Sequence, residues 1–155
     1  MARTNIHSSM YVPIKGTTTN DAAAAGMVGE YIESVITDST AFPSSGHMGD
    51  LTHIHLTAGD WDVTAFLYCI KGATTVLTYW AAGVTQVSGD SFAGIVAAKN
   101  YALGATLTPS LEGGVGVPTH RISLASETDI YLKYYAEFTT STLAAKGYIS
   151  ARRVR

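Results

Sequence analysis

The sequence predicts an all-β protein, a jelly-roll β-sandwich of about eight antiparallel strands that follows an extended N-terminal arm. Residues 61–69 (WDVTAFLYC) and 129–138 (DIYLKYYAEF) alternate at the spacing of strands, which places every second side chain on one face. Turn residues recur at short intervals between the apolar segments, and no convincing amphipathic helix is seen. A chain with this pattern buries its core between two sheets.

Residues 1–27 are interpreted as the arm and residues 28–155 as the sandwich domain. Large apolar residues are scarce in the arm, and its segment 16–26 (GTTTNDAAAAG) has no periodic pattern. Such a segment either stays mobile or lies on a partner. The arm does contain one short apolar cluster, which consists of Met10, Tyr11, Val12 and Ile14. We expect this cluster to attach the protein to a groove or sheet edge of a partner; the alternative is that it packs back on its own sandwich.

The expected strands of the domain follow from the apolar segments and the turns between them. They cover residues 28–36, 52–57, 61–69, 75–80, 101–108, 120–124, 129–138 and 143–152. The segment 112–118 is rich in glycine and proline and is predicted to form a turn. Residues 91–100 fit either a short helix or a buried strand, and strand with loop is the favoured interpretation.

The alternation also assigns side chains to faces. The expected core residues are Trp61, Val63, Leu67, Ile130, Leu132 and Phe138. The opposite faces of the same two strands carry Phe66, Tyr68, Tyr131 and Tyr135. A lone sandwich would leave these aromatic rings in water, so we interpret them as candidate contacts to a second sheet or a neighbouring subunit.

The composition bears on the kind of partner. The 155 residues fit one domain, and the net charge of −2 gives no electrostatic case for binding nucleic acid or an anionic membrane. Charged residues make up 14% of the chain, against about 25% in ordinary soluble domains. Because so sparse a charge suits a surface covered by neighbours, we expect a homo-oligomer. No signal-peptide pattern and no long apolar segment is seen, so synthesis in a cytoplasm as a soluble protein is expected.

Histidines offer the one hint of a metal site. His53 and His55 are two residues apart on an expected strand and could reach one ion from the same face. A third ligand from His47, Asp50 or His120 would require a chance approach in the fold. The favoured interpretation is therefore a pair of exposed polar positions between the core residues of the strand, and no metal or cofactor is expected.

Other candidate catalytic groups are equally sparse. Asp60 and Asp62 flank Trp61, but Asp60 is expected in a turn and Asp62 on the outward face of a strand, so the two carboxylates diverge. Cys69 is the only cysteine and is interpreted as a small core residue. No nucleophile elbow, phosphate loop, zinc-protease or dinucleotide motif occurs, so the protein is not expected to be an enzyme.

The C-terminal segment 146–155 (KGYISARRVR) holds four of the ten basic residues. Its end supplies three candidate contacts to another subunit or to an acidic surface: Arg152, Arg153 and Arg155. The alternative is a final strand whose outward side chains are solvated and whose basic end is free.

Three segments resemble a family of small tailed-bacteriophage virion proteins and fibre-end domains. They are NDAAAAGMVGEYIES (20–34), IHLTAGDWDVTAF (54–66) and VPTHRISLASETDIYLKYYAEFTTSTLAAKGYISARRVR (117–155). The step AGDWDV into a core strand, followed late in the chain by IYL, also looks like the jelly roll of trimeric C1q-like and tumour-necrosis-factor-like domains. The resemblance implies a homotrimer that packs through aromatic and aliphatic residues on an outer sheet face.

The resemblance implies a bacteriophage virion structural protein, made in the host cytoplasm and carried on the virion surface. A homotrimeric capsid decoration or cement protein, anchored by its arm to the major capsid protein or another virion protein, is the favoured function. The alternative is the tip of a tail fibre, spike or head fibre that binds a host receptor or glycan. The chain has no heptad or collagen repeat to build a shaft, which favours decoration.

Overall fold

The computed structural model describes residues 22–96, 99–108, 112–139 and 141–155, and within these residues the protein is all-β. Its strands are β1 (Tyr31–Ala41), β2 (His47–Leu56), β3 (Gly59–Lys71), β4 (Val76–Thr85), β5 (Tyr101–Gly104), β6 (Gly113–Leu124), β7 (Thr128–Thr139) and β8 (Leu143–Arg153). In the described part of the chain, no helix is long and apolar enough to cross a membrane. The arm residues Met10, Tyr11, Val12 and Ile14 lie outside the described residues.

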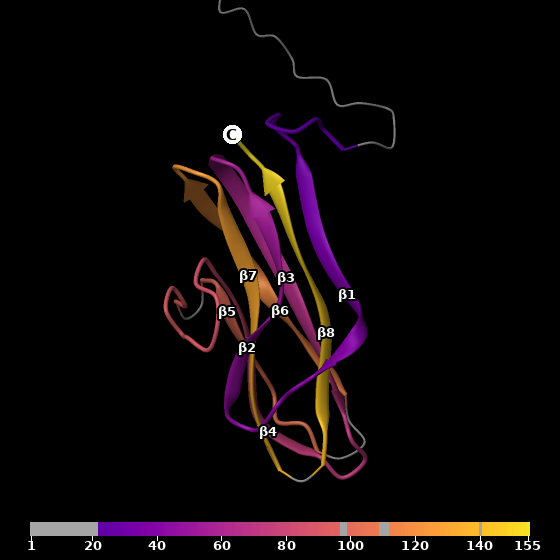
Figure 1. Cartoon of the computed structure of the whole chain (residues 1–155). Helices are drawn as coiled ribbons and strands as arrows, with labels where there is room; N and C mark the ends of the chain where they lie inside the picture. Colours follow the sequence, from indigo (N-terminus) through magenta and orange to yellow (C-terminus); the bar gives the residue numbers. More distant parts are fainter. Residues whose placement is uncertain (1–21, 97–98, 109–111, 140) are drawn as a thin grey trace, which may run out of the picture.

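The strands form two antiparallel sheets that pack face to face (Figure 1). The first sheet has the order β1-β8-β3-β6 and the second the order β2-β7-β4-β5. The pairs β1 with β8, β2 with β7, β3 with β6 and β4 with β5 are nested within one another along the chain. Rolling one long hairpin into two layers produces this nesting, which is the arrangement a jelly roll requires. The prediction of an all-β sandwich is confirmed.

The core lies between the sheets, where the alternating side chains of β3 and β7 meet. Trp61, Val63, Leu67, Ile130 and Leu132 are fully buried there. Phe138 is only partly buried and packs at the margin of the core, with its ring centroid 6.3 Å from that of Phe42.

The prediction of a turn at residues 112–118 is wrong, because Gly113 begins β6. The glycines belong to the strand for a steric reason: a Cβ at Gly114 would lie 2.1 Å from the ring of Phe66 on β3. Pro118 is accommodated because β6 is an edge strand and the register of its pairing shifts at this point, between Val63 and Ala65. Both residue types that suggested a turn are therefore explained by the neighbouring strand.

The described residues between Thr85 and Tyr101 form a loop, so of the strand and loop expected for 91–100 only the loop is found among them. This β4–β5 loop lies beside the second sheet and is joined to it by several hydrogen bonds (Figure 1). Its docking explains Lys133, which faces outward from β7 as the alternation predicts, yet is only 1% exposed. The Lys133 ammonium donates to the carbonyl of Gly89 in the loop at 2.6 Å and forms an ion pair with Asp50 of β2.

Candidate functional site

The outer face of the first sheet carries an uncharged row of side chains across its strands. Val35 of β1 is in register with Tyr148 of β8, Tyr148 with Phe66 of β3, and Phe66 with Gly116 of β6. We call Val35, Phe66 and Tyr148 the aromatic row. Val35 is 52% exposed and Tyr148 38%, while Phe66 is half-buried. The rings of Phe66 and Tyr148 are stacked with centroids 6.3 Å apart and planes inclined by 19°.

The glycines of β6 make this face flat. Since neither Gly114 nor Gly116 has a side chain, the Phe66 ring lies down over β6 instead of standing out from the sheet. A second large ring, Tyr68, lies in the next register position beside Gly114 and donates a hydrogen bond to Glu112. The result is a flat surface with the uncharged aromatic row at its centre, as in many protein interfaces, and with Lys146 in register with Tyr68 at its edge.

Charged groups border the aromatic row toward the end of the sheet that carries the C-terminus. There Arg152 is in register with Tyr31 and with Asp62, and Asp62 lies 3.7 Å from the guanidinium of Arg121. An apolar centre with a polar rim is the usual anatomy of a subunit contact. Val35 and Tyr148 were not among the candidates from the sequence, although the alternation of β1 and β8 does place them on this face.

The four aromatic candidates for a subunit contact, Phe66, Tyr68, Tyr131 and Tyr135, do not share one surface, because the structure places them on opposite faces of the sandwich. Phe66 and Tyr68 lie on the first sheet, whereas Tyr131 and Tyr135 lie on the outer face of the second. The chain itself partly covers that second face, since Phe92 of the β4–β5 loop approaches Tyr135 with ring centroids 5.5 Å apart. The aromatic candidates therefore form two separate surfaces; the one on the second sheet, which also exposes Tyr79 and Leu103, is partly covered by the chain's own loop.

The basic C-terminal end is bound to the domain rather than free. Arg153 is buried, donates to Glu30 at 2.9 Å, and lies with its guanidinium carbon 4.2 Å from the centre of the Trp61 ring. Arg155 is 80% exposed but donates to Asp60 at 2.6 Å. Arg153 is thus unsuited to the particle contact proposed for it from the sequence, whereas Arg152 is exposed.

These contacts join the two ends of the described chain. The backbone amide of Gly29 donates to Arg153 and that of Arg153 to Glu30. Burial of the Glu30 carboxyl raises its pKa, but hydrogen bonds from Arg153 and from the Gly26 amide outweigh it, so the pKa of Glu30 lies below its ordinary value. The chain that leaves the domain toward the arm is therefore anchored at a defined point (Figure 1).

His53 and His55 are exposed and alternate with buried Ile54 and Leu56, as expected for two polar positions on the outer face of a strand. The partner of His55 is Asp129, whose carboxylate lies 2.8 Å from the ring Nδ1, and Glu127 lies 3.7 Å from Nε2. Within the described residues, no group of three metal-ligating side chains is close enough to hold an ion.

We expect the pKa of His55, measured by NMR titration, to lie above its ordinary value, because the hydrogen bond to Asp129 stabilises the imidazolium form. This stabilisation is complete below the ordinary histidine pKa and is lost as the pH rises through the raised pKa. Asp129→Asn should lower the pKa of His55 toward about 6.5. Asp38→Asn, on a strand of the other sheet, is the matched control, and an unchanged pKa in the Asp129 variant would contradict the assignment.

The acidic pair offers no catalytic geometry. Asp60 lies in β3 and not in a turn, and hydrogen bonds from Ser123 and Arg155 lower its pKa. Asp62 lies near Arg121 on the outer face, so the two carboxylates have separate partners. Cys69 is buried in the core, and burial raises the pKa of its thiol to about 12, which makes it unreactive.

The fold is shared with chains from solved structures of a virus and of particles derived from it. A structure of the infectious bursal disease virus Gx strain matches with a TM-score of 0.52 and 13% identity over 92% of this chain and 37% of that chain. T=1 particles derived from infectious bursal virus match with a TM-score of 0.54 and 15% identity over 92% and 36%. The VP2 subviral particle of infectious bursal disease virus matches with a TM-score of 0.52 and 12% identity over 92% and 38%.

This chain spans little more than a third of the length of those viral chains. No protein-family model matches the sequence, and neither does any curated protein. At such low identities the likeness concerns the fold, and the chain shares its β-sandwich with proteins from virus particles.

Proposed function

We propose that this protein is a structural component of a virus particle that assembles as a homotrimer. The observation that carries the proposal is the aromatic row on the outer face of the first sheet, a flat line of uncharged side chains that a single chain leaves partly exposed. Surfaces of this kind are unfavourable in water and are typical of permanent subunit contacts. The β-sandwich shared with chains from infectious bursal disease virus and from particles derived from it supports a virion role.

Within that role, we propose a capsid decoration or cement protein of a tailed bacteriophage, located at the particle surface. The resemblance of three chain segments to small phage virion proteins supports this finer assignment. The role is structural and does not require catalysis. In this proposal the aromatic row joins the subunits, and the arm attaches the trimer to the major capsid protein.

Sedimentation velocity of the purified protein at micromolar concentration tests the assembly. We expect a particle of three times the 16.3 kDa chain mass. Tyr148→Lys should produce monomers, because it places a charge in the centre of the contact. Leu103→Lys is the matched control, since Leu103 is 56% exposed on β5 of the other sheet and should leave the trimer intact. A monomeric wild-type protein at micromolar concentration would overturn the proposal.

Attachment is tested separately with particles from which the protein has been stripped. A chain that lacks residues 1–19 should still form trimers but should no longer bind these particles. If the truncated trimers bind with full occupancy, attachment does not depend on the arm. The exposed Arg152 and Arg155 would then be the next residues to substitute.

A further inference from the structure

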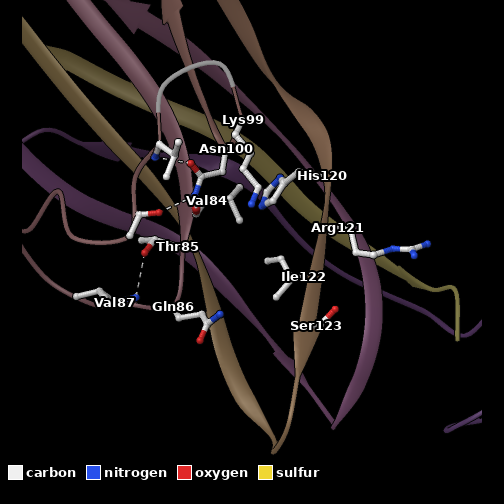
Figure 2. Close-up of a pocket in the computed structure, with 12 residues that line it drawn as sticks. Val84, Thr85, Gln86, Val87, Lys99, Asn100, His120, Arg121, Ile122 and Ser123 are labelled. Atoms are coloured by element: carbon white, nitrogen blue, oxygen red, sulfur yellow. Dashed lines mark hydrogen bonds between the residues drawn. The ribbon is translucent and has the colours of Figure 1, made fainter.

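A cavity of about 460 Å³ opens at one side of the sandwich, between β6 and the β4–β5 loop (Figure 2). It exists because β5 is short and pairs only with Trp80–Gly83 of β4. The Val84 amide donates a hydrogen bond to the Asn100 carbonyl. From Val84 to the end of β4, no strand of the described chain lies between the edge of β4 and β6. The volume is within the range of ordinary small-molecule sites.

One buried side chain fixes the described part of the loop that forms this wall. The Asn100 amide nitrogen donates to the carbonyls of Val84 and Gly94, each at 2.7 Å, and its oxygen accepts from the amide of Val96 at 2.6 Å. All of these groups are internal to the protein, so Asn100 shapes the cavity without being free to bind a ligand. A site whose wall is fixed in advance loses little entropy on binding.

The interior of the cavity is partly apolar. Val84 and Ile122 line it, and Ile122 packs against the margin of the core while remaining partly exposed. Gln86 also lines the cavity, and its exposed amide offers both donors and an acceptor. An apolar surface beside a polar amide suits a ligand that has one face of C–H groups and several hydroxyls.

The charge of the cavity is positive. Lys99 of the loop and His120 of β6 lie together at one end of it (Figure 2), and none of the described lining residues is an acid. Arg121 contributes to the lining but its side chain points away, toward Asp62 at 3.7 Å. Two neighbouring basic groups without a carboxylate between them favour an anionic ligand.

We propose that this cavity binds a sugar that bears a carboxylate, of the uronic-acid type. The carboxylate lies between Lys99 and His120, the ring lies against Val84 and Ile122, and a hydroxyl reaches Gln86. The proposal goes beyond the virion role, because a decoration protein does not need such a site. It would suit a particle component that contacts acidic glycans on a cell surface.

Proton uptake gives the proposal a distinctive signature. Burial, together with the positive charge of Lys99, lowers the pKa of His120 in the free protein, while its hydrogen bond to the Pro118 carbonyl opposes this shift. A bound carboxylate favours the protonated ring, so it raises that pKa again. The affinity for the acidic sugar should therefore increase as the pH falls from about 8 to about 6.

The test is an NMR titration of the isotope-labelled protein with glucuronic acid, and with glucose, which carries an uncharged hydroxymethyl group in place of the carboxylate. Glucuronic acid should shift the signals of the residues that line the cavity, and glucose should bind at least about tenfold more weakly. Lys99→Met should weaken glucuronic acid binding by about tenfold, whereas Lys146→Met, on the outer face of the first sheet, should leave it unchanged.

His120→Gln should remove the gain in affinity at low pH while keeping the binding measured at about pH 8. Equal binding of glucose and glucuronic acid, shifts located elsewhere, or an unaffected Lys99 variant would overturn the proposal. The spectrum of each variant reports in the same experiment whether the fold is retained. The trimer and attachment experiments do not involve this cavity, so the two proposals can fail independently.

Discussion

Trp61→Ala is expected to lower the free energy of unfolding by about 3–5 kcal/mol, measured by urea denaturation. Trp61 has no exposed surface, and its indole nitrogen donates to the Thr57 carbonyl at 2.9 Å. The truncation therefore leaves a large cavity in the core and removes the hydrogen bond that ties the ring to Thr57, an exposed residue between β2 and β3. It also removes the ring against which the Arg153 guanidinium packs, and with it part of the contact that anchors Glu30.

Trp61→Phe separates these contributions. It keeps an aromatic ring beneath Arg153 but removes the hydrogen bond to Thr57, and we expect it to cost about 1–2 kcal/mol. The assignment of Trp61 to the core is contradicted if the Trp61→Ala variant unfolds at the same urea concentration as the wild-type protein. An alanine variant of normal stability that has lost binding to glycans would show instead that Trp61 belongs to a binding surface.

The alternation along the chain was sufficient to predict the sandwich and the direction of most side chains. It succeeded for β3 because each inward residue, such as Trp61 or Val63, is apolar and packs on the opposite sheet. It failed for β6, where glycine and proline indicated a turn. The small residues are required there by the ring of Phe66 on another strand, and that neighbour cannot be identified from the local sequence.

The sequence predicted which aromatic side chains point outward, but not which of them share a surface, because that also depends on distant strands. The alternation correctly placed Phe66 and Tyr135 on outward faces, but it contains no information about which sheet each strand joins. Strand order is set by pairing between distant segments, and it separates the two residues onto opposite faces. Phe92 then covers part of the Tyr135 ring, an approach of the β4–β5 loop that its irregular sequence does not indicate.

Burial of charge was the least predictable property. Arg153 lies near the end of the sequence, where a solvated side chain is expected. It is buried instead, because it is paired with Glu30, a residue 123 positions away in the chain. Lys133 likewise had the position of an exposed lysine, and only the docked loop makes it buried. Ion pairs between distant segments leave no periodic signal, so neither one could be inferred before the fold was known.

Asp50→Asn is expected to lower the free energy of unfolding by about 3 kcal/mol at neutral pH, because it leaves the buried ammonium of Lys133 without its counter-charge. The value is at the lower end of the usual range because the Asp50 side chain keeps 22% of its surface exposed. The loop should also loosen, since Asp50 accepts hydrogen bonds from the Gly89 amide and the Ser88 hydroxyl, each at 2.8 Å. Hydrogen exchange of the Gly89 amide measures this second effect.

The double variant Asp50→Asn/Lys133→Met decides whether the loss arises from the unpaired charge. Because it removes both charges, it should be more stable than Asp50→Asn alone, and a purely additive loss would contradict the explanation.

The pH dependence of stability gives an independent measurement of the same carboxylate. Burial raises the pKa of Asp50, but the bonds from Lys133, Gly89 and Ser88 outweigh it, so the pKa lies below its ordinary value. The contribution of this carboxylate is therefore present above about pH 4 and is lost as the pH falls through the lowered pKa, and the Asp50→Asn variant should lack that acid-induced loss.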